Sequence, residues 1–161
     1  MTAKGSKSKR LSESNSRATS QPSRIVFLLD RCLGCYDVPR ALNEAGIATE
    51  LHKRHFNSDT PDEHWLAVAG ERGWAVITKD GKFRSRQVEI AALLRGSVAS
   101  FVLTSGSATG PDNGKSIIAA MPQMLGLIAK LDAPFIAKIT AGGAVEVIVT
   151  REKLRRLVHQ S

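Results

Sequence analysis

The sequence contains no long apolar stretch and only two cysteines among its 161 residues. No apolar run approaches the ~20 residues of a membrane-spanning helix, which excludes an integral membrane protein. The N-terminus also lacks the apolar core of a secretory signal. Two cysteines without an export signal indicate a reducing compartment. We therefore expect a cytoplasmic protein with no structural disulfide and no membrane partner.

Acidic residues are scarce at the start of the chain. The net charge is +8, and residues 1–24 contribute +5 of it, with six basic residues and a single acid, Glu13. Residues 1–23 also contain almost no apolar side chains, so we expect them to form a disordered basic tail before a domain at 24–161. A basic balance favours a polyanionic partner. Because most of the charge lies in the tail, loose nucleic-acid binding by the tail would not define what the domain does.

Two apolar runs each lead to an aspartate. Residues 25–29 precede Asp30, and residues 75–77 lead through Thr78 and Lys79 to Asp80. Continuous apolar runs are typical of strands buried on both faces of a parallel sheet, where ligands bind at the carboxyl ends of the strands. Asp62 begins the helix that leads into the second run, and a right-handed crossover would bring it to the same edge.

The remaining patterns alternate between strand and helix. We predict a three-layer α/β sandwich with a mostly parallel central sheet, a C-terminal β-hairpin and a short last helix. A capping box is predicted at Thr60, with Pro61 as the first helical residue and Glu63 as its acid, after a polar loop over 52–59. The expected strands cover 25–29, 47–51, 74–78, 98–103, 135–139 and 145–149, and the expected helices 36–46, 60–73, 88–94, 116–131 and 152–158.

The three aspartates suit a divalent metal. Mg²⁺ and Mn²⁺ prefer oxygen ligands, and phosphodiester hydrolysis uses such ions to orient and ionise water. Each acid also has a simpler explanation except Asp30. Asp62 and Glu63 lie in the first turn of a helix, where the helix dipole favours acids, and Asp80 could belong to a turn with Gly81.

Three short motifs in this order resemble the PIN-like nuclease domain, and more closely its VapC-type toxin subgroup. The motifs are Phe-Leu-Leu-Asp at 27–30, Thr-Pro-Asp-Glu-x-Trp-Leu at 60–66 and Val-Ile-Thr-Lys-Asp at 76–80. The resemblance covers residues 24–140. It implies a metal-dependent ribonuclease that cleaves RNA with Mg²⁺ or Mn²⁺ and is neutralised by a cognate antitoxin. It also implies a metal site of Asp30, Asp62 and Asp80, with Glu63 as a further candidate, and is compatible with a homodimer.

The chain departs from the family pattern at one position. Many relatives carry a further acid two residues after the Thr-Lys-Asp motif, where this chain has Lys82. The departure leaves open whether one or two metals bind. It also keeps an alternative function, a weakly active or inactive PIN-like module that binds RNA or a protein partner.

Basic residues flank the acids and suit an RNA substrate. Contacts to phosphate fix the position of a nucleic acid without reading its sequence. The alternative is an ordinary solvated loop. The candidate phosphate contacts are Arg31, Lys79, Lys82, Arg84 and Arg86.

A lesser alternative is a redox or zinc protein. Cys32 and Cys35 form a C-x-x-C motif between a strand and a helix, the position of a thioredoxin-like pair. His52 and His55 could join them in a zinc site, although the spacing differs from the usual finger pattern. Two small thiols without a special role explain the motif more simply.

Overall fold

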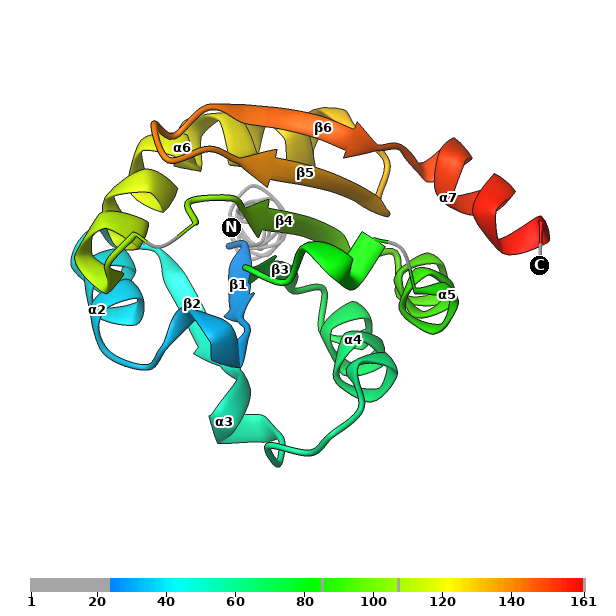
Figure 1. Cartoon of the computed structure of the whole chain (residues 1–161), viewed down its shortest axis with the longest axis horizontal. Coiled ribbons are helices and arrows are strands. Elements are labelled where there is room, and N and C mark those ends of the chain that lie inside the picture. The colour runs from blue at the N-terminus through cyan, green and yellow to red at the C-terminus, as the bar shows by residue number, and fades with distance from the viewer. Residues whose placement is uncertain (1–23, 85, 107, 161) are drawn as a thin grey trace, which may run out of the picture.

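A six-stranded sheet forms the centre of the computed structural model, which describes residues 24–84, 86–106 and 108–160 (Figure 1). The predicted tail over 1–23 lies outside the described residues. The strand order is β2-β1-β3-β4-β5-β6, and every neighbouring pair is parallel except β5 and β6. The strands are β1 (Val26–Leu29), β2 (Ala48–Leu51), β3 (Ala75–Thr78), β4 (Ala99–Leu103), β5 (Phe135–Ile139) and β6 (Val145–Val149).

Helices cover both faces of this sheet. One layer contains α2 and α6, and the other contains α4, α5 and α7 (Figure 1). The α-helices are α2 (Asp37–Glu44), α3 (His52–His55), α4 (Asp62–Glu71), α5 (Gln87–Gly96), α6 (Gly110–Lys130) and α7 (Arg151–His159), and short 3-10 helices follow β1 (η1, Arg31–Leu33) and β3 (η2, Gly81–Arg84). The predicted three-layer α/β sandwich with a terminal hairpin and a short last helix is confirmed.

The first strand is buried from both sides, as its sequence predicts. Phe27 and Leu29 pack in the core beneath α2 and α6, whereas Leu28 packs in the core beneath α4 and α5. Side chains alternate between the two faces of a strand, so a strand that lies between two helical layers needs apolar residues at every position.

The connections between strands change direction at β1. The chain passes from β1 outward to β2 and then returns to β3 on the other side of β1. Adjacent strands whose connections run in opposite directions form a topological switch point, which is where open α/β sheets bind their ligands. Asp30 follows β1 and Asp80 follows β3, so both lie at this point.

Several predicted boundaries are wrong. The loop over 52–59 contains the short helix α3, in which the Phe56 N–H donates to the His52 carbonyl (2.9 Å). The capping box at Thr60 is absent. Helix α4 instead begins at Asp62, with Pro61 in the N-cap position and no side-chain cap. The Pro61 carbonyl accepts from the N–H groups of His64 (3.0 Å) and Trp65 (3.4 Å) and so closes the first turn of the helix.

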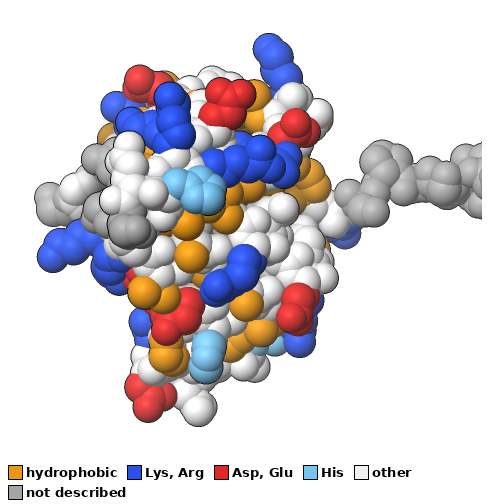
Figure 2. All heavy atoms as spheres, turned by 90° about the vertical axis from the view of Figure 1, so that its right-hand side faces the viewer, with side chains coloured by type: hydrophobic (Ala, Val, Ile, Leu, Met, Phe, Trp, Pro, Cys, Tyr) orange, Lys and Arg blue, Asp and Glu red, His pale blue; other side chains and the backbone are white. Residues whose placement is uncertain are grey.

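The side of the molecule built from α4, α5 and α7 carries charges of both signs. Figure 2 shows lysine and arginine side chains interspersed with aspartate and glutamate over this face. In the described part of the chain, no helix is both long and apolar enough to cross a lipid bilayer.

Candidate active site

Asp30 is fixed at the end of β1 by both its main chain and its carboxylate. Its N–H donates to the carbonyl of Ile77 in β3 (3.0 Å). Its Oδ1 accepts from the N–H of Arg31 (2.7 Å), and its Oδ2 accepts from the hydroxyl of Thr78 (2.7 Å). The residue is only 8% exposed. A buried carboxylate with these donors is held in one orientation.

Thr78 joins the ends of the two strands. While its hydroxyl donates to Asp30, the same oxygen accepts from the N–H of Asp80 (3.0 Å). The carboxylate of Asp80 then accepts from the Lys82 N–H through Oδ1 (3.0 Å) and from Nη2 of Arg86 through Oδ2 (2.7 Å). The Thr-Lys-Asp motif therefore supplies one acid, Asp80, and its threonine hydroxyl orients a second acid, Asp30.

Asp62 reaches the same edge from the start of α4. Its Oδ1 accepts from the indole N–H of the buried Trp65 (2.9 Å), and its Oδ2 accepts from Nη1 of Arg86 (3.2 Å). Arg31 lies on the other side, 3.8 Å from Oδ1. The predicted approach of Asp62 to the edge of the sheet agrees with this position.

A fourth acid, Glu89, belongs to the group and was missed by sequence reasoning. It lies in the first turn of α5, is buried, and accepts from Nη1 of Arg86 (2.6 Å). The hydrogen bond with Glu89 is the main cause that raises the pKa of Arg86, and the charge of Asp80 raises it further. The signal in the sequence was an acid in the first turn of the helix after Asp80, rather than two residues after it at Lys82.

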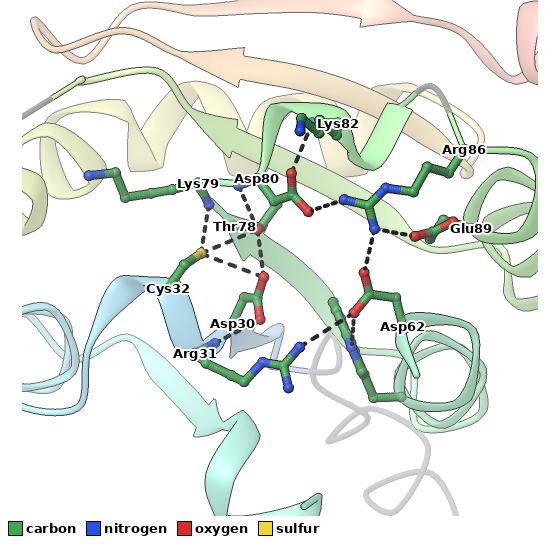
Figure 3. A network of polar contacts seen from close by, with 11 residues as sticks. Asp30, Arg31, Cys32, Asp62, Thr78, Lys79, Asp80, Lys82, Arg86 and Glu89 are labelled. Carbon is green, nitrogen blue, oxygen red and sulfur yellow. Dashed lines mark hydrogen bonds and ion pairs between the residues drawn. The ribbon is translucent and has the colours of Figure 1, made fainter. Parts of the chain in front are cut away.

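Figure 3 shows how these acids relate. Asp62, Asp80 and Glu89 converge on the guanidinium of Arg86, and Thr78 connects Asp30 to Asp80. Glu63 is not part of this network in the described part of the chain, and its predicted role in a capping box is wrong.

The predicted phosphate contacts occupy different positions around the acids. Arg31 and Arg86 point toward the carboxylates, and Lys79 Nζ donates to the Gly106 carbonyl (3.1 Å). Lys82 contributes its main-chain N–H to Asp80. The side chain of Arg84 lies outside what the structure describes. Binding of RNA by these residues stays a prediction.

Cys32 belongs to the acidic site, whereas His52 and His55 make their contacts with other residues. The Sγ of Cys32 accepts from the Lys79 N–H (3.1 Å) and lies 3.5 Å from Asp30 Oδ2. Burial, and then the charge of Asp30, raises the pKa of the Cys32 thiol. Both cysteines are free. His55 contacts Glu50 (2.7 Å), and His52 packs against aromatic rings. These contacts do not assemble the zinc site considered from the sequence.

The donor chemistry of the edge fits a hard divalent ion. Carboxylate oxygens are the ligands that Mg²⁺ and Mn²⁺ prefer, and this edge provides four carboxylates, with the guanidinium groups of Arg31 and Arg86 beside them. Among the described residues, however, no three acidic, histidine or cysteine side chains already lie close enough together to hold a metal ion. The guanidinium of Arg86 lies between the carboxylates instead.

One of the acids, Asp30, borders a small hollow. A cavity of about 120 Å³ is lined by Asp30, Arg31, His52 and Lys53 together with apolar side chains. Larger hollows of about 390 and 430 Å³ lie away from the acids, at the start of α7 and beside α2.

Comparison with known proteins agrees with this architecture. A family model described as "PIN like domain" matches residues 25–105, which include all four acids. The chain is 25% identical over 138 residues to the protein named "Putative ribonuclease VapC45" from Mycobacterium tuberculosis, covering 80% of this chain and 99% of that protein. No solved structure matches the chain significantly. The family match spans half of the chain and the fold is the one expected of it, so the chain belongs to the PIN-like domain family.

Proposed function

We propose that this protein is a metal-dependent endoribonuclease and the toxin of a toxin–antitoxin pair. The observation that carries the proposal is the gathering of Asp30, Asp62, Asp80 and Glu89 at the switch point of the sheet. Family membership and the likeness to a protein named as a ribonuclease support the same activity.

The position of each residue at the site suggests its role. Asp62, Asp80 and Glu89 would hold Mg²⁺ or Mn²⁺, with Asp30 as the fourth carboxylate, oriented by Thr78. A bound divalent ion supplies a water that is ionised near neutral pH and stabilises charge on the leaving oxygen. Arg31, Lys79 and Lys82 lie at the rim of the acids, where cationic groups would position the phosphates of an RNA strand.

The contacts of Arg86 also suit a second function. A guanidinium shared by three carboxylates would also suit a PIN-like module that binds RNA or a protein without cleaving it. The two functions differ in one respect: only the nuclease requires a metal at these acids.

An RNA cleavage assay with purified full-length protein separates them. Cleavage is expected with Mn²⁺, is lost in EDTA, and falls about 100-fold or more in Asp80→Asn. Glu44→Gln is the matched control, because Glu44 is an exposed acid at the last position of α2 that pairs with the exposed Arg40. If wild-type protein cleaves no RNA and binds no Mn²⁺, the binding module is the better account.

A further inference from the structure

Arg86 makes an unusual set of contacts for a side chain that is 43% exposed. Its Nη1 donates to both Glu89 Oε1 (2.6 Å) and Asp62 Oδ2 (3.2 Å), and its Nη2 donates to Asp80 Oδ2 (2.7 Å). The three carboxylates come from α5, from α4 and from the connection after β3. One guanidinium therefore links three separate elements (Figure 3).

The acids need a cation at this place. Three carboxylates that approach one point repel one another, and the Glu89 side chain is only 6% exposed, so water compensates its charge poorly. Arg86 provides both the positive charge and the hydrogen bonds. Its planar fork of donors suits several carboxylates at once, which a lysine would not do as well.

Two of the three acids are held in place, whereas the arginine is able to move. Asp62 is held by the indole of Trp65, and Glu89 lies within the packed first turn of α5. Arg86 immediately precedes α5 and keeps much of its long side chain in solvent. Its guanidinium is therefore able to turn into water without opening the core.

We propose that Arg86 is a positioning residue that acts as the internal counter-cation of the acidic site. It holds Asp62, Asp80 and Glu89 together in the metal-free protein and leaves them when a divalent ion binds. This inference rests on the proposed metal-dependent function. Because the guanidinium occupies the point on which the three carboxylates converge, an ion that binds at this point takes the place of Arg86. The apparent affinity for the ion is then the intrinsic affinity multiplied by the fraction of protein in the arginine-free state.

Calorimetric titration of MnCl₂ into the full-length protein tests the competition without any reference to activity. Arg86→Gln removes the charge and is expected to bind Mn²⁺ about tenfold tighter than wild type, which corresponds to about 1.4 kcal/mol. The matched control is Arg40→Gln, an exposed arginine that pairs with Glu44 at 3.1 Å on α2 and is expected to leave Mn²⁺ affinity unchanged. Equal or weaker Mn²⁺ binding by a folded Arg86→Gln would overturn the proposal.

Thermal melting adds a second readout. In EDTA, Arg86→Gln is expected to melt below wild type, because its carboxylates repel one another without a counter-cation. With saturating Mn²⁺ the two proteins are expected to melt closer together. A purely structural role for Arg86 predicts the same deficit with and without metal, and that result would contradict the proposal.

The wild-type protein offers a direct test that does not depend on any variant folding. The side-chain N–H signals of Arg86 in ¹⁵N NMR spectra are expected to shift as Mg²⁺ is added, with the same midpoint as metal binding. Signals that stay in place while Mg²⁺ binds would overturn the inference. If the wild type binds Mn²⁺ and cleaves RNA but Arg86→Gln shows no gain of Mn²⁺ affinity, only the counter-cation role of Arg86 is refuted. If neither protein binds metal, the proposed function is refuted as well.

Discussion

Thr78 is the residue on which the geometry of the two strand-end acids depends. It is fully buried, and its hydroxyl is shared between the carboxylate of Asp30 and the main chain of Asp80. A neutral hydroxyl does this without adding a charge to a crowded acidic site. The position therefore requires a hydroxyl for polar reasons and a methyl-sized group for packing in β3.

Replacement of Thr78 by valine should destabilise the protein by about 1–3 kcal/mol, because a buried charged acceptor loses its donor while the volume is unchanged. Thr78→Ser keeps the hydroxyl and should lose less. Urea denaturation of the three proteins measures the difference. A valine variant as stable as the wild type would show that the hydroxyl contributes nothing.

His52 predicts a pH dependence of stability. Both ring nitrogens are buried and lack a hydrogen-bond partner among the described residues, and the ring packs against Phe56 and Trp65. Burial lowers the pKa of His52, the charge of Arg31 lowers it further, and the charges of nearby aspartates oppose the shift. The folded protein therefore resists protonation of this ring.

The sign of the effect follows from proton linkage. Below a pH of about 6.5 the unfolded chain binds a proton at His52 that the folded chain does not, so the free energy of unfolding falls as the pH decreases. His52→Phe should flatten this fall between about pH 6.5 and 5. Urea denaturation in EDTA across this range provides the measurement. Parallel stability curves for the two proteins would be inconsistent with a buried neutral histidine.

The candidate acids differ in how well the sequence reveals them. Asp30 and Asp80 follow buried strands, so the apolar runs that precede them in the sequence predict where both acids lie. Glu89 was not identified from the sequence, because its place in the site depends on where α5 begins and on the contact with Arg86. Nor does the sequence show that Arg86 turns toward the acids, because a basic residue beside acidic ones suits either an ion pair or an RNA contact.

At the scale of elements, the crossing of α4 and α5 sets the distance between two of the acids. Gly70 in α4 faces Gly96 in α5 so closely that a Cβ on Gly70 would lie 2.5 Å from the Gly96 Cα. Asp62 begins α4 and Glu89 lies in the first turn of α5. The glycine contact therefore fixes the relation of the helices that carry both acids.

Gly70→Ala should push the two helices apart and destabilise the protein by about 1–3 kcal/mol. It should also weaken Mn²⁺ binding, since Asp62 moves relative to Glu89. Gly126→Ala in α6 is the matched control, because a Cβ there would meet nothing within 4 Å. Its expected effect is neutral or stabilising by up to about 1 kcal/mol. Unchanged melting and Mn²⁺ affinity in Gly70→Ala would contradict this role of the crossing.

Helix starts were the least predictable elements. Helix α6 begins at Gly110, six residues before the predicted start, with the Thr109 side chain accepting from the Asp112 N–H. A stretch rich in glycine, proline and aspartate is typical of a loop, but here the glycines allow close packing: a Cβ on Gly114 would meet the Ala41 side chain of α2 at 2.9 Å. Tertiary packing thus overrides local preference. The terminal hairpin at 135–139 and 145–149 was predicted to the residue.

At the scale of the whole molecule, the charge is distributed between a basic tail and a domain of mixed charge. The net charge is +8, of which residues 1–24 contribute +5. The acidic site lies in the domain, where four carboxylates and basic side chains stand side by side. Attraction of RNA and hydrolysis of RNA should therefore depend on different residues.

Conversion of the five basic residues of the tail to glutamine should weaken RNA binding without slowing cleavage at saturating RNA. The variant replaces Lys4, Lys7, Lys9, Arg10 and Arg17. For each phosphate that the variant no longer neutralises, the slope of log K against log salt should become shallower by about 0.7 for single-stranded RNA. Fluorescence anisotropy in EDTA measures binding and a saturated assay measures cleavage. A large drop in the saturated rate would place the tail in the catalytic machinery.

Analysis of the RNA ends produced by cleavage tests the central claim most directly. A metal held by Asp30, Asp62, Asp80 and Glu89 would supply an activated water as the attacking group, so the proposed cleavage would not use the 2′-hydroxyl of the RNA. The products should carry a linear phosphate on one end and a hydroxyl on the other, and EDTA should abolish their formation. Products with a 2′,3′-cyclic phosphate that form equally well in EDTA would contradict the metal-dependent account.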